Sequence, residues 1–450
     1  MTTVAAHRPV ITPAPGRADA SVPALVLKFD PNVMHHGGLG AIRSLGRMGV
    51  PVYAVQESAW APAGHSRYLG GKVLWRPAGL SAERLQAGLL RLAELIGRPS
   101  VLIPTDDAGA IFLAEHGEPL RDAFLFPDQP ASLPRQLAGK HSLHLLCAEL
   151  GFPSPRSSLP SSLPQAAEAA AAYGYPVVGK LARPWRSESQ QCSTQIIGDP
   201  AALEGAWHAS QAGAAGLMLQ EYIPAAPGHD WFFHGYAAAA GSCSPACTGI
   251  KDRSYPAHAG LTSYGRCMPN AALRDGVTSL LTKLGYRGIA DLDLRLDERD
   301  GQYKLLDFNP RLGAQFRLFT GQGGLDVVRA AYLDLTGQRV TGAEPESGRT
   351  FMVESYDLLS AISYWRRREI SLRSWLAGTR QVDELAWFAR DDLRPFGLMC
   401  LRMGWRMLTR SLLRAVAAPQ RASQPHPDRP ARPRLRHGRN KAARMARAAS

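Results

Sequence analysis

The sequence Gln302-Tyr303-Lys304-Leu305-Leu306-Asp307-Phe308-Asn309-Pro310-Arg311 carries most of the information about this chain. Its polar and apolar residues alternate up to Phe308, and the side chains of a strand point to its two faces in turn, so the run predicts a strand. One face would carry Tyr303, Leu305, Asp307 and Asn309, and the other Lys304, Leu306 and Phe308. Asp307 and Asn309 would therefore share a face, where they could hold one cation together.

The preceding residues 289–296 also alternate, and they predict the partner strand of a hairpin. Asp291, Asp293 and Arg295 share one face of it, and the turn 297–301 is polar. If the hairpin closes symmetrically, Asp293 lies opposite Asp307, and facing carboxylates repel each other unless a cation lies between them. Carboxylate and amide oxygens suit Mg²⁺. The alternative is a surface hairpin whose acids are only solvated.

The chain has 450 residues, enough for two or three domains, and a formal net charge of +14. The excess charge is uneven, because residues 421–450 hold nine Arg and Lys against the single acid Asp428. The body is thus only mildly basic, which suits anionic substrates without requiring nucleic acid. The six cysteines show no zinc-ligand spacing and indicate thiols in a reducing compartment. We expect a soluble cytoplasmic protein, since no signal peptide or spanning helix is evident.

The first ordered part predicts a Rossmann-like α/β unit. A strand at 24–28, a glycine-rich loop at 34–40, a helix at 41–47 and a strand at 50–55 follow one another. The G-x-G-x-x-G spacing of dinucleotide-binding proteins is absent, so the glycines either make a tight turn or contact a ligand. A helix at 81–96 and a strand at 101–104 continue the pattern.

A second unit begins near Leu137, and its lysines and acids fall at the ends of predicted elements. Lys140 opens an amphipathic helix, Lys180 ends the strand 174–180, and Glu221 lies in the strand 217–224. Further predicted elements are a strand at 231–236, a basic loop beginning at 249–253, and helices at 271–284 and 325–335.

The carboxy-terminal part predicts helices at 356–375 and 397–417. Arg402, Arg406, Arg410 and Arg414 recur every four residues in the second, opposite apolar residues. Such a helix docks on its own protein or lies on an anionic membrane. The Pro- and Arg-rich tail predicts disorder.

The ordered set of these motifs resembles the ATP-grasp superfamily, in particular its carboxylate–amine ligase branch. The set comprises Lys140, the Tyr-Pro-Val-Val-Gly-Lys strand, the Gln-Glu-Tyr-Ile-Pro strand, the Lys-x-Arg loop and the Asp-x-Asn-Pro-Arg strand. The resemblance covers residues 23–340 and implies a Rossmann-like pre-ATP-grasp domain followed by a two-lobed α+β ATP-grasp domain. The expected division is a disordered leader at 1–22, these two domains at 23–135 and 136–340, a helical extension at 341–418 and a disordered basic tail at 419–450.

The resemblance also implies a role for particular residues. Lys140 and Lys180 would contact the phosphates of ATP, Glu221, Tyr222 and Ile223 the adenine, and Asp230 the ribose. Lys251 and Arg253 would face the transferred phosphate, Arg311 the acyl phosphate, and Asp293, Asp307 and Asn309 would bind Mg²⁺. The acceptor would lie near residues 36–38 and 105–107.

Two departures from the family pattern stand out. Asp307 occupies a position where Glu is usual, so the strand or the ion must shift, or Asp307 must bind through one oxygen. The loop at 183–190 lacks the glycines with which the family often covers the phosphates.

The implied activity is an ATP- and Mg²⁺-dependent ligation of a small-molecule carboxylate to an amine through an acyl phosphate, with Mn²⁺ as an alternative metal. Two other readings stay open. One is an ATP-dependent small-molecule kinase. The other is a degenerate ATP-grasp protein that binds an anionic membrane or nucleic acid through its basic carboxy terminus.

Overall fold

The computed structural model describes residues 18–181, 194–211, 216–238, 241–258, 260–340 and 346–416. The chain divides into two compact units, residues 1–403 and 404–450, and the contacts discussed below lie within the first. The covering loop at 183–190, the basic tail and most of the predicted leader lie outside the described residues. In the described part, no helix combines the length and the apolar character needed to cross a membrane.

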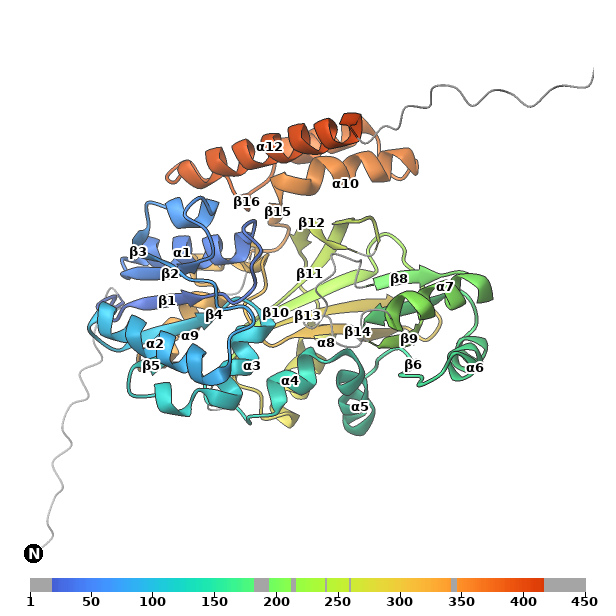
Figure 1. Cartoon of the computed structure of the whole chain (residues 1–450), viewed down its shortest axis with the longest axis horizontal. Coiled ribbons are helices and arrows are strands. Elements are labelled where there is room, and N and C mark those ends of the chain that lie inside the picture. Colours follow the sequence, from blue (N-terminus) through green and yellow to red (C-terminus); the bar gives the residue numbers. More distant parts are fainter. Residues whose placement is uncertain are drawn as a thin grey trace, which may run out of the picture. The chain divides into compact units, whose positions relative to one another are not determined.

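The first layer is a parallel five-stranded sheet, coloured blue to cyan in Figure 1, with the order β3-β2-β1-β4-β5. Its strands are β1 (Ala24–Leu27), β2 (Val52–Gln56), β3 (Leu69–Leu74), β4 (Ser100–Pro104) and β5 (Phe124–Leu125). Its helices are α1 (His36–Met48), α2 (Ala82–Ile96) and α3 (Asp107–His116), with short 3-10 turns η1 (Pro62–His65) and η2 (Glu118–Leu120). All four residues of β1 are buried, as in a parallel sheet covered on both faces. The predicted Rossmann-like unit is confirmed.

The glycine-rich segment is not a loop. It forms the first turns of α1, which begins at His36 rather than at Ala41. A Cβ on Gly37 would lie 2.9 Å from the Ala314 Cα, and one on Gly40 would lie 2.8 Å from the Phe316 ring. These glycines therefore let α1 pack closely on residues 314–317, and neither a tight turn nor ligand contact is needed to explain them.

Two further sheets follow, both visible in Figure 1, and their strands are antiparallel except for the parallel pair β15–β16. The four-stranded sheet has the order β6-β9-β7-β8, and the seven-stranded sheet has the order β14-β13-β10-β11-β12-β15-β16. The first comprises β6 (Ser157–Ser158), β7 (Val177–Leu181), β8 (Thr194–Ile197) and β9 (Leu217–Glu221), with α6 (Leu163–Tyr173) and α7 (Pro200–Gln211). The second comprises β10 (Asp230–Ala237), β11 (Cys243–Tyr255), β12 (Leu261–Cys267), β13 (Gly288–Asp297), β14 (Gln302–Asn309), β15 (Thr350–Met352) and β16 (Glu384–Leu385).

The remaining helices connect and cover these sheets. They are α4 (Leu133–Ala138), α5 (Lys140–Leu150), α8 (Ala271–Lys283), α9 (Val327–Leu335), α10 (Glu354–Arg366), α11 (Leu372–Arg380) and α12 (Arg394–Val416), with the 3-10 turns η4 (Phe316–Phe319) and η5 (Gln322–Gly324). Lys140 opens α5, as the sequence predicts. The single helix predicted at 356–375 is instead two, because residues 367–371 interrupt it.

The hairpin that the sequence predicts is formed by β13 and β14, and Asp293 lies directly opposite Asp307. The alternation predicted for β14 is wrong in its first half. Leu294 pairs with Leu305, so Leu306 is an extra residue in a β-bulge. The bulge places Tyr303 and Leu305 with Phe308 on the core side, while Asp307 stays opposite Asp293.

The prediction that a basic loop begins at residues 249–253 is also wrong, because Lys251 and Arg253 lie within the long strand β11. A second bulge surrounds Asp252, since Lys251 pairs with Gly265 and Arg253 with Tyr264. A further difference concerns the carboxy-terminal segment, which was expected to be helical. Two short strands, β15 and β16, extend the seven-stranded sheet, with β15 pairing to β12.

A buried ion pair joins α1 to the carboxy-terminal segment. Arg43, 1% exposed, donates from Nε to Asp392 Oδ2 at 3.0 Å and from Nη2 to the Trp387 carbonyl at 2.7 Å. Asp392 also accepts from the Ser66 hydroxyl at 2.7 Å and the Arg67 amide at 2.9 Å. Every charge in this cluster has a partner, which burial requires.

We expect Arg43→Ala to lower the free energy of unfolding by about 3–5 kcal/mol, because it leaves Asp392 buried without its cation. The exposed pair of Arg47 with Asp391, at 2.9 Å, is the matched control. Arg47→Ala should cost less than about 1 kcal/mol. Urea titration measures both, and equal costs for the two variants would contradict the assigned role of the buried pair.

Candidate functional site

A cleft lies between the four-stranded sheet and the β13–β14 hairpin. It gathers eight of the twelve residues for which the sequence suggests a role: Lys180, Glu221, Tyr222, Ile223, Asp230, Lys251, Asp293 and Asp307. Strands from both antiparallel-paired sheets supply these residues, so the cleft forms only when the two sheets lie next to each other. A concave site with several convergent charged groups is the usual form of a ligand-binding site.

The centre of the cleft is the pair of facing carboxylates, Asp293 and Asp307, each with a side chain 29% exposed. Lys251 Nζ donates to Asp293 Oδ1 at 2.9 Å, and Lys140 Nζ donates to Asp307 Oδ1. Lys180 Nζ donates at 3.1 Å to the carbonyl of Leu306, the bulged residue. Three lysines from three different elements thus surround two acids.

The ionisation of these groups follows from their neighbours. Burial would raise the pKa of Asp307, but the Lys140 and Lys180 ammonium groups outweigh it and hold that pKa below its ordinary value. Burial, with the nearby Lys140 charge, lowers the pKa of Lys180 to about 8. Burial opposes the charge on Lys251, but Asp293 and Asp230 outweigh it and raise its pKa. The cleft is therefore a tightly coupled set of opposite charges.

The end of β9 and the residues that follow it also line the cleft. Glu221 Oε2 accepts from Arg156 Nε at 3.0 Å, and its Oε1 lies 2.9 Å from Arg299 Nη2. Burial would raise the pKa of Glu221, but Arg156 lowers it overall. The Glu221 carboxylate is thus already engaged by protein cations.

Asp230 is held by an arginine that the sequence reasoning did not single out. Arg295 Nε donates to Asp230 Oδ1 at 2.5 Å, and Arg295 Nη1 donates to the Ile223 carbonyl at 3.0 Å. Arg295 therefore fixes Asp230 relative to the segment that follows β9. Its position two residues after Asp293, on the same face of the strand, is the signal that could have identified it.

A second layer of charge lies next to the facing carboxylates. Asp291 Oδ2 accepts from Arg311 Nη1 at 3.0 Å and from Asn309 Nδ2 at 3.3 Å, and Arg311 Nη2 donates to Asn309 Oδ1 at 2.9 Å. Burial raises the pKa of Asp291 to about 7. Arg311 also lies 3.3 Å from Asp107. Asp291 lies on the same face of its strand as Asp293, although the motifs suggest no role for it. The side-chain oxygen of Asn309, a suggested metal ligand, accepts a hydrogen bond from Arg311 in this structure.

Arg253 lies apart from this group. It forms a bidentate ion pair with Asp357 of α10 at 2.9–3.1 Å, and its guanidinium lies 4.3 Å from the centre of the Tyr264 ring. Trp375 Nε1 also donates to Asp357, at 2.9 Å. Arg253 does not line the cleft in the structure, so its suggested role at the transferred phosphate stays a prediction.

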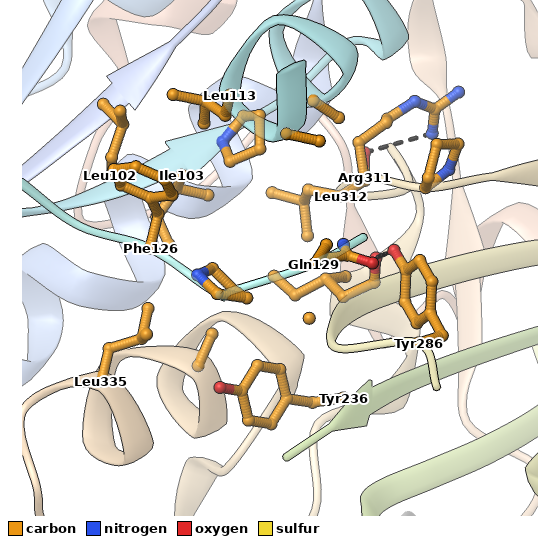
Figure 2. A pocket seen from close by; sticks show the side chains of 18 residues that line it. Leu102, Ile103, Leu113, Phe126, Gln129, Tyr236, Tyr286, Arg311, Leu312 and Leu335 are labelled. Carbon is orange, nitrogen blue, oxygen red and sulfur yellow. Dashed lines mark hydrogen bonds between the residues drawn. The ribbon is translucent and has the colours of Figure 1, made fainter. Parts of the chain in front are cut away.

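An apolar pocket of about 50 Å³ adjoins Arg311, and Figure 2 shows its lining. It lies at the carboxyl end of β4, the position where α/β sheets commonly bind ligands. The labelled apolar side chains are Leu102, Ile103, Leu113, Phe126, Leu312 and Leu335. The Tyr286 hydroxyl donates to the Ile289 carbonyl and the Tyr236 hydroxyl to Asp334, each at 2.6 Å. Arg311 is the charged residue among those that line the pocket.

The donor set at the centre of the cleft is suited to Mg²⁺. The described residues contain no cluster of three or more His, Cys, Asp or Glu able to hold a metal. Mg²⁺ does not require one, because it commonly takes one or two carboxylates and completes its shell with water and substrate phosphates. Asp293 and Asp307 meet that requirement from adjacent strands, with Asn309 two residues further on.

The wall behind β9 contains a buried histidine. His144 contacts the Ser154 hydroxyl through Nδ1 at 3.1 Å, and the Ser157 hydroxyl and Gln220 through Nε2 at 2.6 Å. Burial lowers the pKa of His144 to about 4, with a smaller contribution from Lys180. The imidazole is therefore neutral in the folded protein at neutral pH.

This predicts an acid-dependent loss of stability. Between pH 6.5 and pH 4 the unfolded chain protonates His144 and the folded chain does not, so the free energy of unfolding falls as the pH falls. His144→Gln should reduce the loss measured between pH 7.5 and pH 5.0 by about 2 kcal/mol. The exposed His208 is the control, and His208→Gln should show the wild-type loss. An unaltered pH dependence in His144→Gln would contradict the prediction.

Comparison with known proteins finds similarity to one curated protein by sequence and to several solved structures by fold. No family profile matches it. It is 25% identical over 248 residues to D-aspartate ligase of Enterococcus faecium (strain Aus0004), an alignment that covers 51% of this chain and 57% of that protein. The chain thus spans little more than half the length of this curated relative.

Solved structures cover more of the chain at lower identity. Biotin carboxylase from Campylobacter jejuni has a TM-score of 0.58 and 14% identity, covering 74% of this chain and 75% of its own. The biotin carboxylase domain of Hydrogenobacter thermophilus 2-oxoglutarate carboxylase, in complex with MgADP, ADP and bicarbonate, has a TM-score of 0.54 and 16% identity and covers 74% of each chain. L-amino acid ligase from Bacillus licheniformis has a TM-score of 0.54 and 15% identity, and the match covers 74% of this chain and 79% of the ligase chain. The chain therefore has the ATP-grasp fold, as its ordered motifs indicate.

Proposed function

We propose that this protein is an ATP- and Mg²⁺-dependent carboxylate–amine ligase that forms an amide through an acyl phosphate. The observation that supports this most directly is the cleft in which Lys140, Lys180 and Lys251 surround the facing Asp293 and Asp307. Fixed cations around a metal-binding pair of acids are what phosphoryl transfer requires, because charge on the transferred phosphoryl group must be stabilised. The names of the similar proteins point to the same class of reaction.

In the proposed mechanism, ATP lies along the cleft with its adenine near Glu221, Tyr222 and Ile223 and its ribose near Asp230. Lys140 and Lys180 exchange their present partners for the phosphates. Asp293, Asp307 and Asn309 would hold Mg²⁺, or Mn²⁺ in its place, which would neutralise phosphate charge when bound. Asn309 must first release Arg311, to which its oxygen is bonded in the structure.

The substrate carboxylate attacks the γ-phosphorus, and the bond to the β,γ-bridging oxygen breaks to give an acyl phosphate and ADP. The amine then attacks the acyl carbon, loses a proton and expels phosphate, forming the amide. Lys251 would stabilise the transferred phosphoryl group, and Arg311 would hold the acyl phosphate. Arg253 could contact the transferred phosphate only if it left Asp357. Breaking that buried bidentate ion pair would be energetically costly.

The acceptor site is proposed at the pocket beside Arg311. This pocket adjoins β4 and α3, near the residues 105–107 where the acceptor was expected. Its apolar lining favours a substrate with an aliphatic group. The division into domains, the cytoplasmic location and any membrane or nucleic-acid contact of the basic tail stay predictions.

The activity can be tested with the purified protein, ATP, Mg²⁺ and pools of carboxylates, including D-aspartate and aliphatic amino acids. Hydroxylamine traps an acyl phosphate as a hydroxamate, so a ligase should produce ADP and hydroxamate together. A stable phosphoester without hydroxamate would favour a kinase. A folded protein that never binds ATP with Mg²⁺ would refute both.

We expect Asp307→Asn and Asn309→Ala each to lower kcat by about 10²-fold or more, because both would remove support for the metal and phosphates. Their melting temperatures should change by only a few degrees, since neither side chain belongs to the apolar core. Glu298→Gln, in the turn of the same hairpin and 74% exposed, should retain full turnover. Wild-type rates for Asp307→Asn would falsify the metal assignment.

A further inference from the structure

Exposed apolar side chains concentrate in the carboxy-terminal part of the described chain. Among all the described residues 17 large apolar residues are exposed, and eight of them lie between residues 354 and 405: Leu358, Leu359, Trp365, Leu372, Leu376, Leu393, Leu401 and Trp405. A concentration of this kind usually marks an interaction surface, whereas isolated exposed residues need no explanation.

The helices α10 and α11 present these residues at helical spacing. Leu358, Ile362 and Trp365 follow the i, i+4, i+7 pattern on α10, and Leu372 and Leu376 follow i, i+4 on α11. Leu358, Trp365, Leu372 and Leu376 are 48–51% exposed. No residue of α11 is buried. We call these four residues and the arginines at 366–368, 373 and 380 the α10–α11 surface.

The orientation of this surface is fixed by contacts on the opposite side of the helices. The carboxylate of Asp357 in α10 accepts hydrogen bonds from Arg253 of β11 and from Trp375 of α11. The Tyr364 hydroxyl accepts a hydrogen bond from the Ser254 amide at 3.2 Å. Because these groups are buried and paired, the exposed leucines cannot turn inward without breaking an ion pair. They stay available to a partner.

The charge of the α10–α11 surface is strongly positive. Arg366, Arg367, Arg368, Arg373 and Arg380 are all exposed. The single acid in residues 366–380 is Glu369, which is paired with His258 at 2.9 Å. The exposed residues of α10, α11 and the segment between them thus include both apolar and cationic side chains, and the acid within residues 366–380 is already paired.

Three candidate binding partners fit the positive charge of the α10–α11 surface poorly. A second copy of the chain in a two-fold contact would bring arginines against arginines. The tail of the same chain carries nine Arg and Lys against one acid after residue 420, and would be repelled. Nucleic acid would use the arginines but leaves the exposed leucines unexplained. An anionic lipid bilayer accepts both kinds of group, since leucine and tryptophan enter the interface while arginine reaches the headgroups.

We propose that the α10–α11 surface attaches this protein peripherally to membranes rich in anionic lipid. The attachment is independent of the ligase reaction proposed above and does not involve the basic tail. It would bring Ser254 and His258, which line the cleft, near the membrane side of the protein, because the amide of Ser254 donates to the Tyr364 hydroxyl of α10.

The test is sedimentation of the full-length chain with vesicles of equal parts phosphatidylglycerol and phosphatidylcholine, against vesicles of phosphatidylcholine alone. The wild type should bind only the anionic vesicles. The double variant Leu372→Ser, Leu376→Ser should bind them about tenfold more weakly, although its tail is intact. The control Leu95→Ser, Leu145→Ser replaces leucines 75% and 59% exposed on α2 and α5, and should bind as the wild type does.

Unaltered vesicle binding by the Leu372, Leu376 double variant would overturn the proposal. So would a triple variant of Arg366, Arg367 and Arg368 to Gln that loses affinity for duplex DNA but keeps vesicle binding, since it would make nucleic acid the occupant. Melting temperatures confirm that the variants fold. ADP formation in the absence of vesicles should match the wild type in all of them, so a negative result for membrane binding leaves the ligase proposal untouched.

Discussion

The cleft is organised by one electrostatic constraint, the presence of two carboxylates directly opposite each other on adjacent strands. Asp293 and Asp307 would repel each other if alone, and three lysines from α5, β7 and β11 compensate for that repulsion. Because these lysines come from separate elements, the cleft forms only when the four-stranded sheet, α5 and the hairpin pack together. Under the proposed function these same lysines would bind the triphosphate, and the packing of the three elements would bring them together before ATP arrives.

Part of the fold and of the site could be predicted from the sequence, and the physical reasons for success and failure differ by residue. The register of the hairpin could be predicted because alternation of acids with leucines allows one pairing that buries the leucines. The β-bulge at Leu306 could not be predicted, because a leucine is compatible with either face of the strand. The same holds for Lys251 and Arg253, which would share a face in a regular strand and are separated by the bulge at Asp252.

The glycines of α1 illustrate a different limit. Their spacing near a strand end suggested a turn or a ligand contact, and the structure explains them by the close approach of residues 314–317, nearly 280 positions later in the chain. The strands β15 and β16 are three and two residues long, too short for any periodic signal. Arg43 and Asp392 likewise look like ordinary surface charges until the fold buries them together. Such long-range contacts have no local signature.

The pairing of β15 with β12 has a consequence for where this fold can be divided. β15 covers the outer side of β12 through the register Tyr264 to Met352, Gly265 to Phe351 and Arg266 to Thr350. A chain ended near residue 340 would leave β12 as an open edge, with backbone donors and acceptors free to pair with another molecule. The carboxy-terminal strand β15 therefore protects the edge of the seven-stranded sheet, and a fragment that keeps this edge paired must extend past residue 352.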